Sequence, residues 1–195
     1  MEIGGRECYF HIDRGSRYLL IQPIDAHASD GLNSQIEYMK QLALGIPFAM
    51  CVFQVNSWFT ELSPWAAPPV FGHQEFGEGA GETLAYIENE MIPAMENCVP
   101  DRQSGRIIGG YSLAGLFARY AAYETDIFNE CAGISPSVWF PNWDEYTDRH
   151  HFGAEFAYLS SGDREEKTKN RQMAAVGERI RRQTAKLEKL PQIRK

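Results

Sequence analysis

One stretch constrains the fold of this chain more than any other: the nearly unbroken apolar run "PFAMCVFQV" at residues 47–55. A strand that is apolar at successive positions must be covered on both faces, as in the middle of a parallel sheet between layers of helices. Patterns with helical spacing precede this run at 30–45 and follow it at 82–97. Strands that alternate with helices indicate an α/β fold with a largely parallel sheet.

The other hydrophobic runs extend this sheet. The short turn "RGS" joins the first two predicted strands, so we expect them to form an antiparallel pair at one edge. Pro93 is expected to kink or end its helix. Strands are predicted at 7–13, 17–24, 106–111, 130–135 and 156–161, and helices at 113–124 and about 166–190.

Composition excludes several classes of partner. The 195 residues, 44% of them hydrophobic, suit one domain, 1–195, with a sizeable core. The net charge of −7 argues against a nucleic-acid binder, and the basic residues at 179–189 are interpreted as a solvated helix face. Since the four cysteines form no CxxC pair and no segment resembles a signal peptide or a membrane span, we expect a soluble, cytoplasmic protein with no membrane partner. Oligomerisation is left open.

The stretch "RIIGGYSLAGLFARYAAYE" places an isolated serine, Ser112, where a predicted strand meets a predicted helix. Gly109 and Gly110 permit a sharp turn, while Ala114 and Gly115 let the helix start close to the strand. This is the steric requirement of a nucleophile elbow, and the helix N-terminus favours developing negative charge. A glycine-rich turn with an incidental serine is the alternative, because the second small position of the strict Gly-x-Ser-x-Gly motif is alanine. A phosphate loop is less favoured, because no Gly-Lys-Ser/Thr follows.

The longer stretch "GGYSLAGLFARYAAYETDIFNECAGISPSVWF" resembles the α/β-hydrolase esterases of the "putative esterase" group, which includes the ferric-enterobactin esterases and relatives of esterase D. "ELSPWAAPPVFGHQEFGEGAGETLAYIENEMIP" resembles the segment that precedes the elbow in that group. "FAYLSSGDREE" resembles the strand that leads to its triad acid. The resemblance spans about 18–187, and it implies an α/β-hydrolase fold and a serine carboxylesterase.

The resemblance also implies the roles of particular groups. Ser112 would attack the acyl carbonyl and form an acyl-enzyme. The backbone N–H of Leu113 would give one oxyanion donor, and a second would come from near Ile24 or Asp25. Neither a metal ion nor a cofactor is expected, and the partner would be a small-molecule ester.

The acid and the base of the triad raise a difficulty. Glu165 matches the group's Gly-x-x-Glu, with Asp163 as the nearby alternative; without the resemblance, "GDREEKTKN" is interpreted as a charged loop that opens a helix. The fold orders its triad as serine, acid and histidine. No histidine follows Glu165, since the five stand at His11, His27, His73, His150 and His151. We therefore expect a chain cut short before its base, with the last strand missing or incomplete, rather than a relocated base at 27, 150 or 151.

Aromatic residues gather in the loops that follow the predicted strands. Trp58, Trp65 and Trp139 are expected to wall an apolar acyl pocket, or else to pack these loops onto the core. Two alternatives to the esterase remain open. One is a catalytically silent, hydrolase-like binding module, and the other is an acyltransferase, in which an alcohol instead of water resolves the acyl-enzyme.

Overall fold

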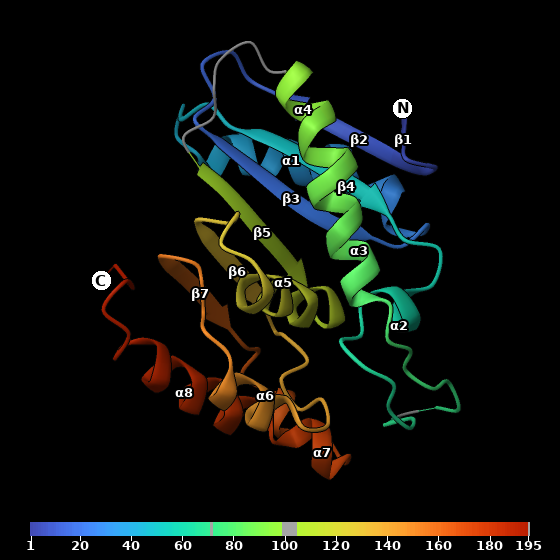
Figure 1. Ribbon diagram of the computed structural model, residues 1–195, viewed down its shortest axis with the longest axis vertical. Helices are drawn as coiled ribbons and strands as arrows, with labels where there is room; N and C mark the ends of the chain where they lie inside the picture. The colour runs from blue at the N-terminus through green and yellow to red at the C-terminus, as the bar shows by residue number, and fades with distance from the viewer. Residues whose placement is uncertain (71, 99–104, 195) are drawn as a thin grey trace.

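The computed structural model describes residues 1–70, 72–98 and 105–194, and these contain one seven-stranded sheet in the order β1-β2-β4-β3-β5-β6-β7 (Figure 1). The strands are β1 (Glu2–Ile3), β2 (Arg6–Ile12), β3 (Tyr18–Ile24), β4 (Ala49–Gln54), β5 (Gly105–Tyr111), β6 (Glu130–Ile134) and β7 (Phe156–Ser160). The helices are α1 (Leu32–Leu42), α2 (Trp58–Glu61), α3 (Ala80–Tyr86), α4 (Ile92–Cys98), α5 (Leu113–Glu124), α6 (Trp143–Arg149), α7 (Arg171–Ala174) and α8 (Val176–Leu187).

The sheet confirms the predicted α/β fold. Strands β4, β3, β5, β6 and β7 run parallel. At one edge, β2 pairs with β4 in an antiparallel ladder, and β1 pairs with β2 in another. The apolar run identified in the sequence forms β4, which is buried from Ala49 to Phe53 and has a strand on each side. A strand that is apolar at five successive positions is stable only where both faces are covered.

The expected pairing of the first two strands is wrong. Strand β2 pairs with β4 instead, so that Phe10 lies opposite Cys51 in an antiparallel ladder. On the other side of β4, Ile21 of β3 pairs with the same Cys51 in a parallel ladder. The physical reason is the composition of β4, because a strand that is apolar from residue 49 to residue 53 belongs between two others. It therefore separates two strands that a short turn connects.

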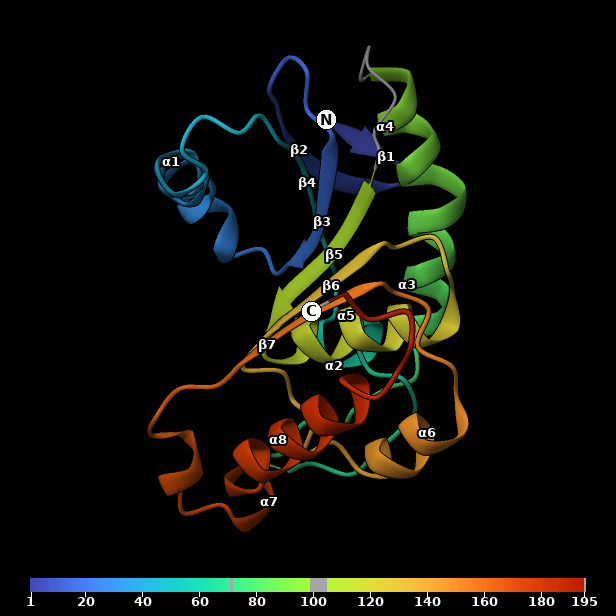
Figure 2. The ribbon, with the colours of Figure 1, turned by 90° about the vertical axis from the view of Figure 1, so that its left-hand side faces the viewer.

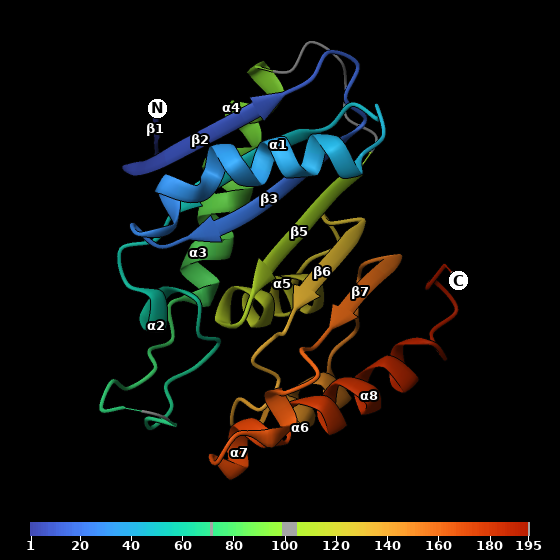
Figure 3. The same cartoon turned by 180° about the vertical axis from the view of Figure 1, so that it is seen from behind.

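Helices cover the two faces of the sheet unequally. Helix α1 lies over β2, β4 and β3 on one face (Figure 3). Leu32 of this helix forms a buried cluster with Ile24, Met50 and Val52. The other helices gather on the opposite face around the main core (Figure 2). On the α1 face, no helix of the described residues covers β5 to β7 (Figure 3). Tyr158 of β7 is exposed.

The helices differ from the sequence predictions at two places. Of the two outcomes predicted at Pro93, a kink or an end, the end is wrong, because a π-helical segment, Ile87–Met91, links α3 to α4. A widened turn before the proline relieves the clash that its ring would make with a preceding carbonyl. The single helix expected at 166–190 is instead a 3-10 turn, α7 and α8, and the Asn170 side chain caps α7 by accepting hydrogen bonds from two backbone N–H groups.

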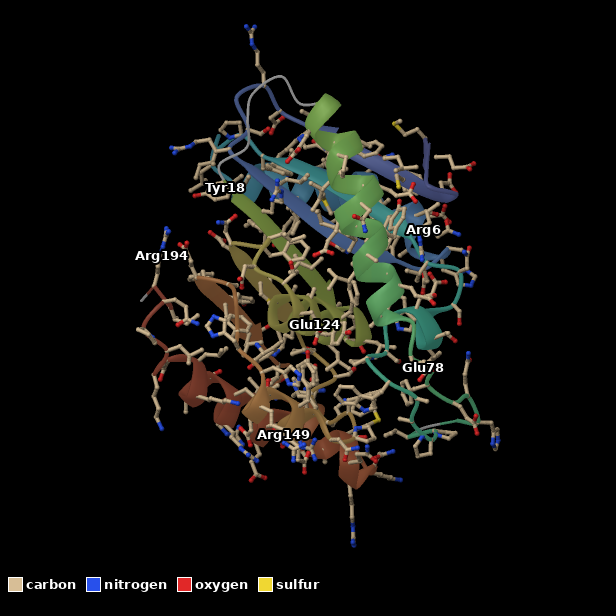
Figure 4. The ribbon with its side chains drawn as sticks, viewed as in Figure 1. Arg6, Tyr18, Glu78, Glu124, Arg149 and Arg194 are labelled. Atoms are coloured by element: carbon tan, nitrogen blue, oxygen red, sulfur yellow. The ribbon has the colours of Figure 1, made fainter. Side chains whose placement is uncertain are left out.

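The sequence indicated that the basic face of α8 is solvated, but part of this face forms ion pairs. Arg179 and Arg182 pair with Asp144 of α6 at 3.8 and 3.4 Å, and Lys186 pairs with Asp148 at 2.9 Å. These ion pairs fasten α8 to α6 and so fix the chain that follows β7. Charged side chains elsewhere lie mostly around the outside of the fold, as Arg149 and Arg194 show (Figure 4).

The cysteine side chains that the structure describes are thiols in the interior of the fold. Cys8, Cys51 and Cys131 are buried and free, whereas the side chain of Cys98 lies outside the described part. Burial raises the pKa of the Cys131 thiol to about 11. Across the described residues, no helix has both the length and the apolar character needed to span a membrane.

Candidate active site

Ser112 occupies a strained turn between β5 and α5. Its backbone has φ 57° and ψ −117°, a conformation that residues with a side chain rarely adopt. The turn is held on three sides: its N–H donates to Ile134 O at 3.0 Å, and its carbonyl accepts from the N–H groups of Leu116 and Ser137, each at 3.0 Å. Strain that is fixed in this way is characteristic of functional sites.

The small residues around Ser112 leave no room for side chains. A Cβ added at Gly110 would lie 2.5–2.6 Å from atoms of Ala114, two of them in its backbone. At Gly115 it would lie 2.9 Å from the Gly110 carbonyl oxygen and 3.1 Å from Pro136. The steric bracket inferred from the sequence is therefore a physical contact between the strand and the helix.

We expect Gly110→Ala to lower the free energy of unfolding by about 3 kcal/mol or more, because rigid backbone atoms must move. Gly109→Ala is the matched control. Its Cβ would meet the end of the Leu20 side chain at 3.3 Å, and we expect a loss below about 1 kcal/mol. Urea denaturation of both variants measures the difference, and equal losses would contradict this account of the turn.

A cavity of about 210 Å³ lies beside Ser112 at the carboxyl ends of β5 and β6. It brings together the end of β5, the end of β6 and the segment after β7, which are distant in the sequence. Its lining is Tyr111, Ser112, Ser135, Trp139, Glu165, Thr168, Met173 and Val176.

Glu165 lines this cavity, and one of its two carboxylate oxygens accepts hydrogen bonds from the protein. Its Oε1 accepts a hydrogen bond from Ser135 Oγ at 2.5 Å and another from the Gly162 N–H at 3.1 Å. Its Oε2 accepts none from any residue that the structure describes. Asp163, the alternative acid, is exposed and is not among the lining residues.

The expected oxyanion donors lie at or just beyond the ends of β5 and β3. Leu113 is the first residue of α5, so its N–H has no acceptor within the helix. Ile24 ends β3, and its carbonyl accepts from Val55 N at 2.9 Å. The Asp25 carboxylate turns back on its own loop and accepts from the N–H groups of His27 and the following alanine at 3.0 and 2.9 Å.

Of the three expected pocket tryptophans, Trp139 lines the cavity. Trp65 packs in an aromatic cluster with Phe140, Trp143 and Tyr146, and its Nε1 donates to a backbone carbonyl at 3.0 Å. Trp58 begins α2 and packs against the main core. Trp58 and Trp65 therefore fit the alternative expectation, in which these aromatic side chains pack the loops onto the core.

No histidine lines the cavity in the part of the chain that the structure describes. His150 forms a hydrogen bond through Nδ1 with the Tyr146 carbonyl at 2.8 Å, and its ring stacks on the Tyr146 ring. His27 and His151 are exposed.

Two serines at the site were not singled out from the sequence. Ser135 follows β6 at φ 45° and lines the cavity, and Ser137 Oγ lies 3.4 Å from Ser112 Oγ. One signal could have found Ser135, since it follows a predicted parallel strand just as Ser112 does.

Comparisons with known proteins concern the family and the fold of the chain. A protein-family model described as "Putative esterase" matches residues 58–192. No curated protein sequence matches the chain. Among solved structures, the siderophore hydrolase EstA from Aspergillus nidulans is 19% identical with a TM-score of 0.67, over 92% of this chain and 73% of that one.

Two further structures are similar to this chain. An IroE-like serine hydrolase from Shewanella oneidensis is 17% identical with a TM-score of 0.74, over 94% of this chain and 65% of that one. The enterobactin esterase FES from Shigella flexneri is 13% identical with a TM-score of 0.65, over 94% of this chain and 48% of that one. The chain thus spans about half the length of that esterase. These similarities confirm the predicted α/β-hydrolase fold.

Proposed function

The chain belongs to the "Putative esterase" family, whose model matches residues 58–192, and on that premise we propose that it is a serine carboxylesterase acting through an acyl-enzyme on Ser112. One observation carries the proposal. Ser112, in its strained turn, and Glu165, which follows β7, line the same cavity. A nucleophile and an acid on one cavity are two of the three parts of a serine hydrolase triad.

The proposed reaction has two halves. In the first, Ser112 Oγ bonds to the ester carbonyl carbon while its proton passes to a base, and the oxyanion forms beside the Leu113 N–H and the N-terminus of α5. The oxyanion then collapses, the bond to the alcohol breaks, and the alcohol leaves with the proton. In the second half, water attacks the acyl group by the same route and releases the acid and free Ser112.

The base in this scheme is an imidazole whose proton-bearing nitrogen faces Glu165. A serine without a base is a weak nucleophile at neutral pH. Because no described histidine lines the cavity, the experiments below supply the base as imidazole in the buffer.

The walls of the cavity favour a small, apolar acyl group. Trp139, Met173 and Val176 offer apolar surface next to Ser112, and about 210 Å³ suits a short chain or a single ring. The similar structures include a siderophore hydrolase and an enterobactin esterase by name. Ester-linked siderophores therefore belong among the substrates to test, together with short-chain aryl esters.

Covalent labelling tests the proposal. A fluorophosphonate should react at Ser112 in an imidazole-dependent manner, and mass spectrometry should find the adduct on the tryptic peptide 107–119, where Ser112 is the one serine. Ser112→Ala should leave this peptide unlabelled. An unlabelled wild-type peptide would contradict the proposal and favour the silent binding module. Ester products formed with an added alcohol would favour the acyltransferase.

A further inference from the structure

Ser135 follows β6 in the same kind of turn that Ser112 forms after β5. Both follow the last residue of a parallel strand, and both have positive φ, 45° and 57°. The two strands are neighbours in the sheet, so the serines stand side by side at one edge and line one cavity. A non-glycine residue in this conformation persists only where its surroundings hold it.

The backbone around Ser135 is fixed from several directions. Its N–H donates to Ser160 O, the end of β7, at 2.8 Å. The next residue is Pro136, whose ring restricts the residue before it. Pro136 also presses against the start of α5, since a Cβ added at Gly115 would lie 3.1 Å from its Cα. The direction of the Ser135 Cα–Cβ bond is therefore determined by its backbone.

That direction carries the Ser135 hydroxyl onto Glu165. Since a carboxylate only accepts, Ser135 Oγ is the donor, and 2.5 Å to Oε1 is typical of a charge-assisted hydrogen bond. The Gly162 N–H reaches the same oxygen at 3.1 Å. Two donors on one oxygen fix the rotation of the carboxylate and leave Oε2, without a partner among the described residues, as the oxygen that can receive an imidazole N–H.

We propose that Ser135 is a positioning residue: by holding Oε1 of Glu165 it presents Oε2 to the base. The inference rests on the proposed function of the Ser112 site, because it assigns Glu165 as the triad acid. It gives Ser135 no contact with the reacting atoms. The effect of removing its hydroxyl should therefore depend entirely on Glu165.

A double-mutant cycle tests this dependence. The measured quantity is the imidazole-dependent, Ser112-dependent hydrolysis of p-nitrophenyl acetate. Ser135→Ala should lower kcat by about tenfold with little change in KM, and it should have no further effect in the Glu165→Gln background. Ser135→Gly, which suits a positive φ and also lacks the hydroxyl, should behave like Ser135→Ala. Ser135→Asn, which tolerates this backbone and can donate from Nδ2, should recover part of the rate.

Three results would overturn the inference. Ser135→Ala and Ser135→Gly could both retain the wild-type rate. Ser135→Ala could lower the rate equally in the wild-type and Glu165→Gln backgrounds, which would indicate a general structural role. In both cases the rate still depends on Ser112, so the proposed function stands. If wild type and Ser112→Ala hydrolyse the ester equally, the proposed function fails and the role of Ser135 fails with it.

Discussion

Replacing Ser112 by alanine is expected to reduce imidazole-dependent hydrolysis of p-nitrophenyl acetate to the rate that imidazole gives in buffer alone. Loss of the nucleophile lowers kcat by roughly 10⁶-fold in a hydrolase with a complete triad, so the background reaction sets the size of the fall. Alanine has no oxygen to form the acyl-enzyme. Its backbone preference at φ 57° is close to that of serine, so the turn should persist. Release of p-nitrophenol over a range of imidazole concentrations measures the effect.

Ser137→Ala is the matched control for this experiment. Ser137 is buried, and its Oγ lies 3.4 Å from Ser112 Oγ, but it does not line the cavity. Loss of so weak a hydrogen bond should lower the rate by less than about tenfold. A Ser112→Ala variant that keeps the wild-type rate would show that Ser112 is not the nucleophile. A larger loss from Ser137→Ala would point to the neighbouring hydroxyl instead.

Much of the fold could be predicted because one interior strand, β4, has a composition that suits a single environment. The apolar run of β4 fits a doubly covered position, and the structure places it between β2 and β3. The order of these strands could not be predicted from the turn between β2 and β3, because a short connection limits distance without specifying pairing. The π-helical segment before Pro93 could not be predicted either, because a proline in a helical pattern indicates a kink or an end and does not specify a widened turn.

The candidate site divides in the same way. The small residues around Ser112 can be recognised from the local sequence, because the strand and the helix that need them are adjacent in the sequence. The position of Glu165 came from a family resemblance, since its local sequence also suits a charged loop. The bond from Ser135 to Glu165 joins residues 30 positions apart, and only the parallel pairing of β6 with β7 brings them together.

Glu165→Gln is expected to lower the imidazole-dependent rate by roughly ten- to a hundredfold, whereas Asp163→Asn should leave it within about twofold. The Glu165 carboxylate should orient the imidazole through Oε2 and stabilise the imidazolium that forms as Ser112 gives up its proton. The amide of glutamine keeps the shape of the side chain but removes its negative charge. Asp163 is exposed and does not line the cavity.

The two variants control for one another, because each replaces a carboxylate with an amide of similar shape and removes one negative charge from the same loop. A general effect of charge would therefore change both rates alike. An effect through the base should appear for Glu165→Gln alone, as a smaller increase in rate per unit of imidazole, with the imidazole-independent rate unchanged. Equal losses would remove Glu165 from the triad. A larger loss from Asp163→Asn would assign the acid to Asp163 and require the loop to turn that carboxylate toward Ser112 during the reaction.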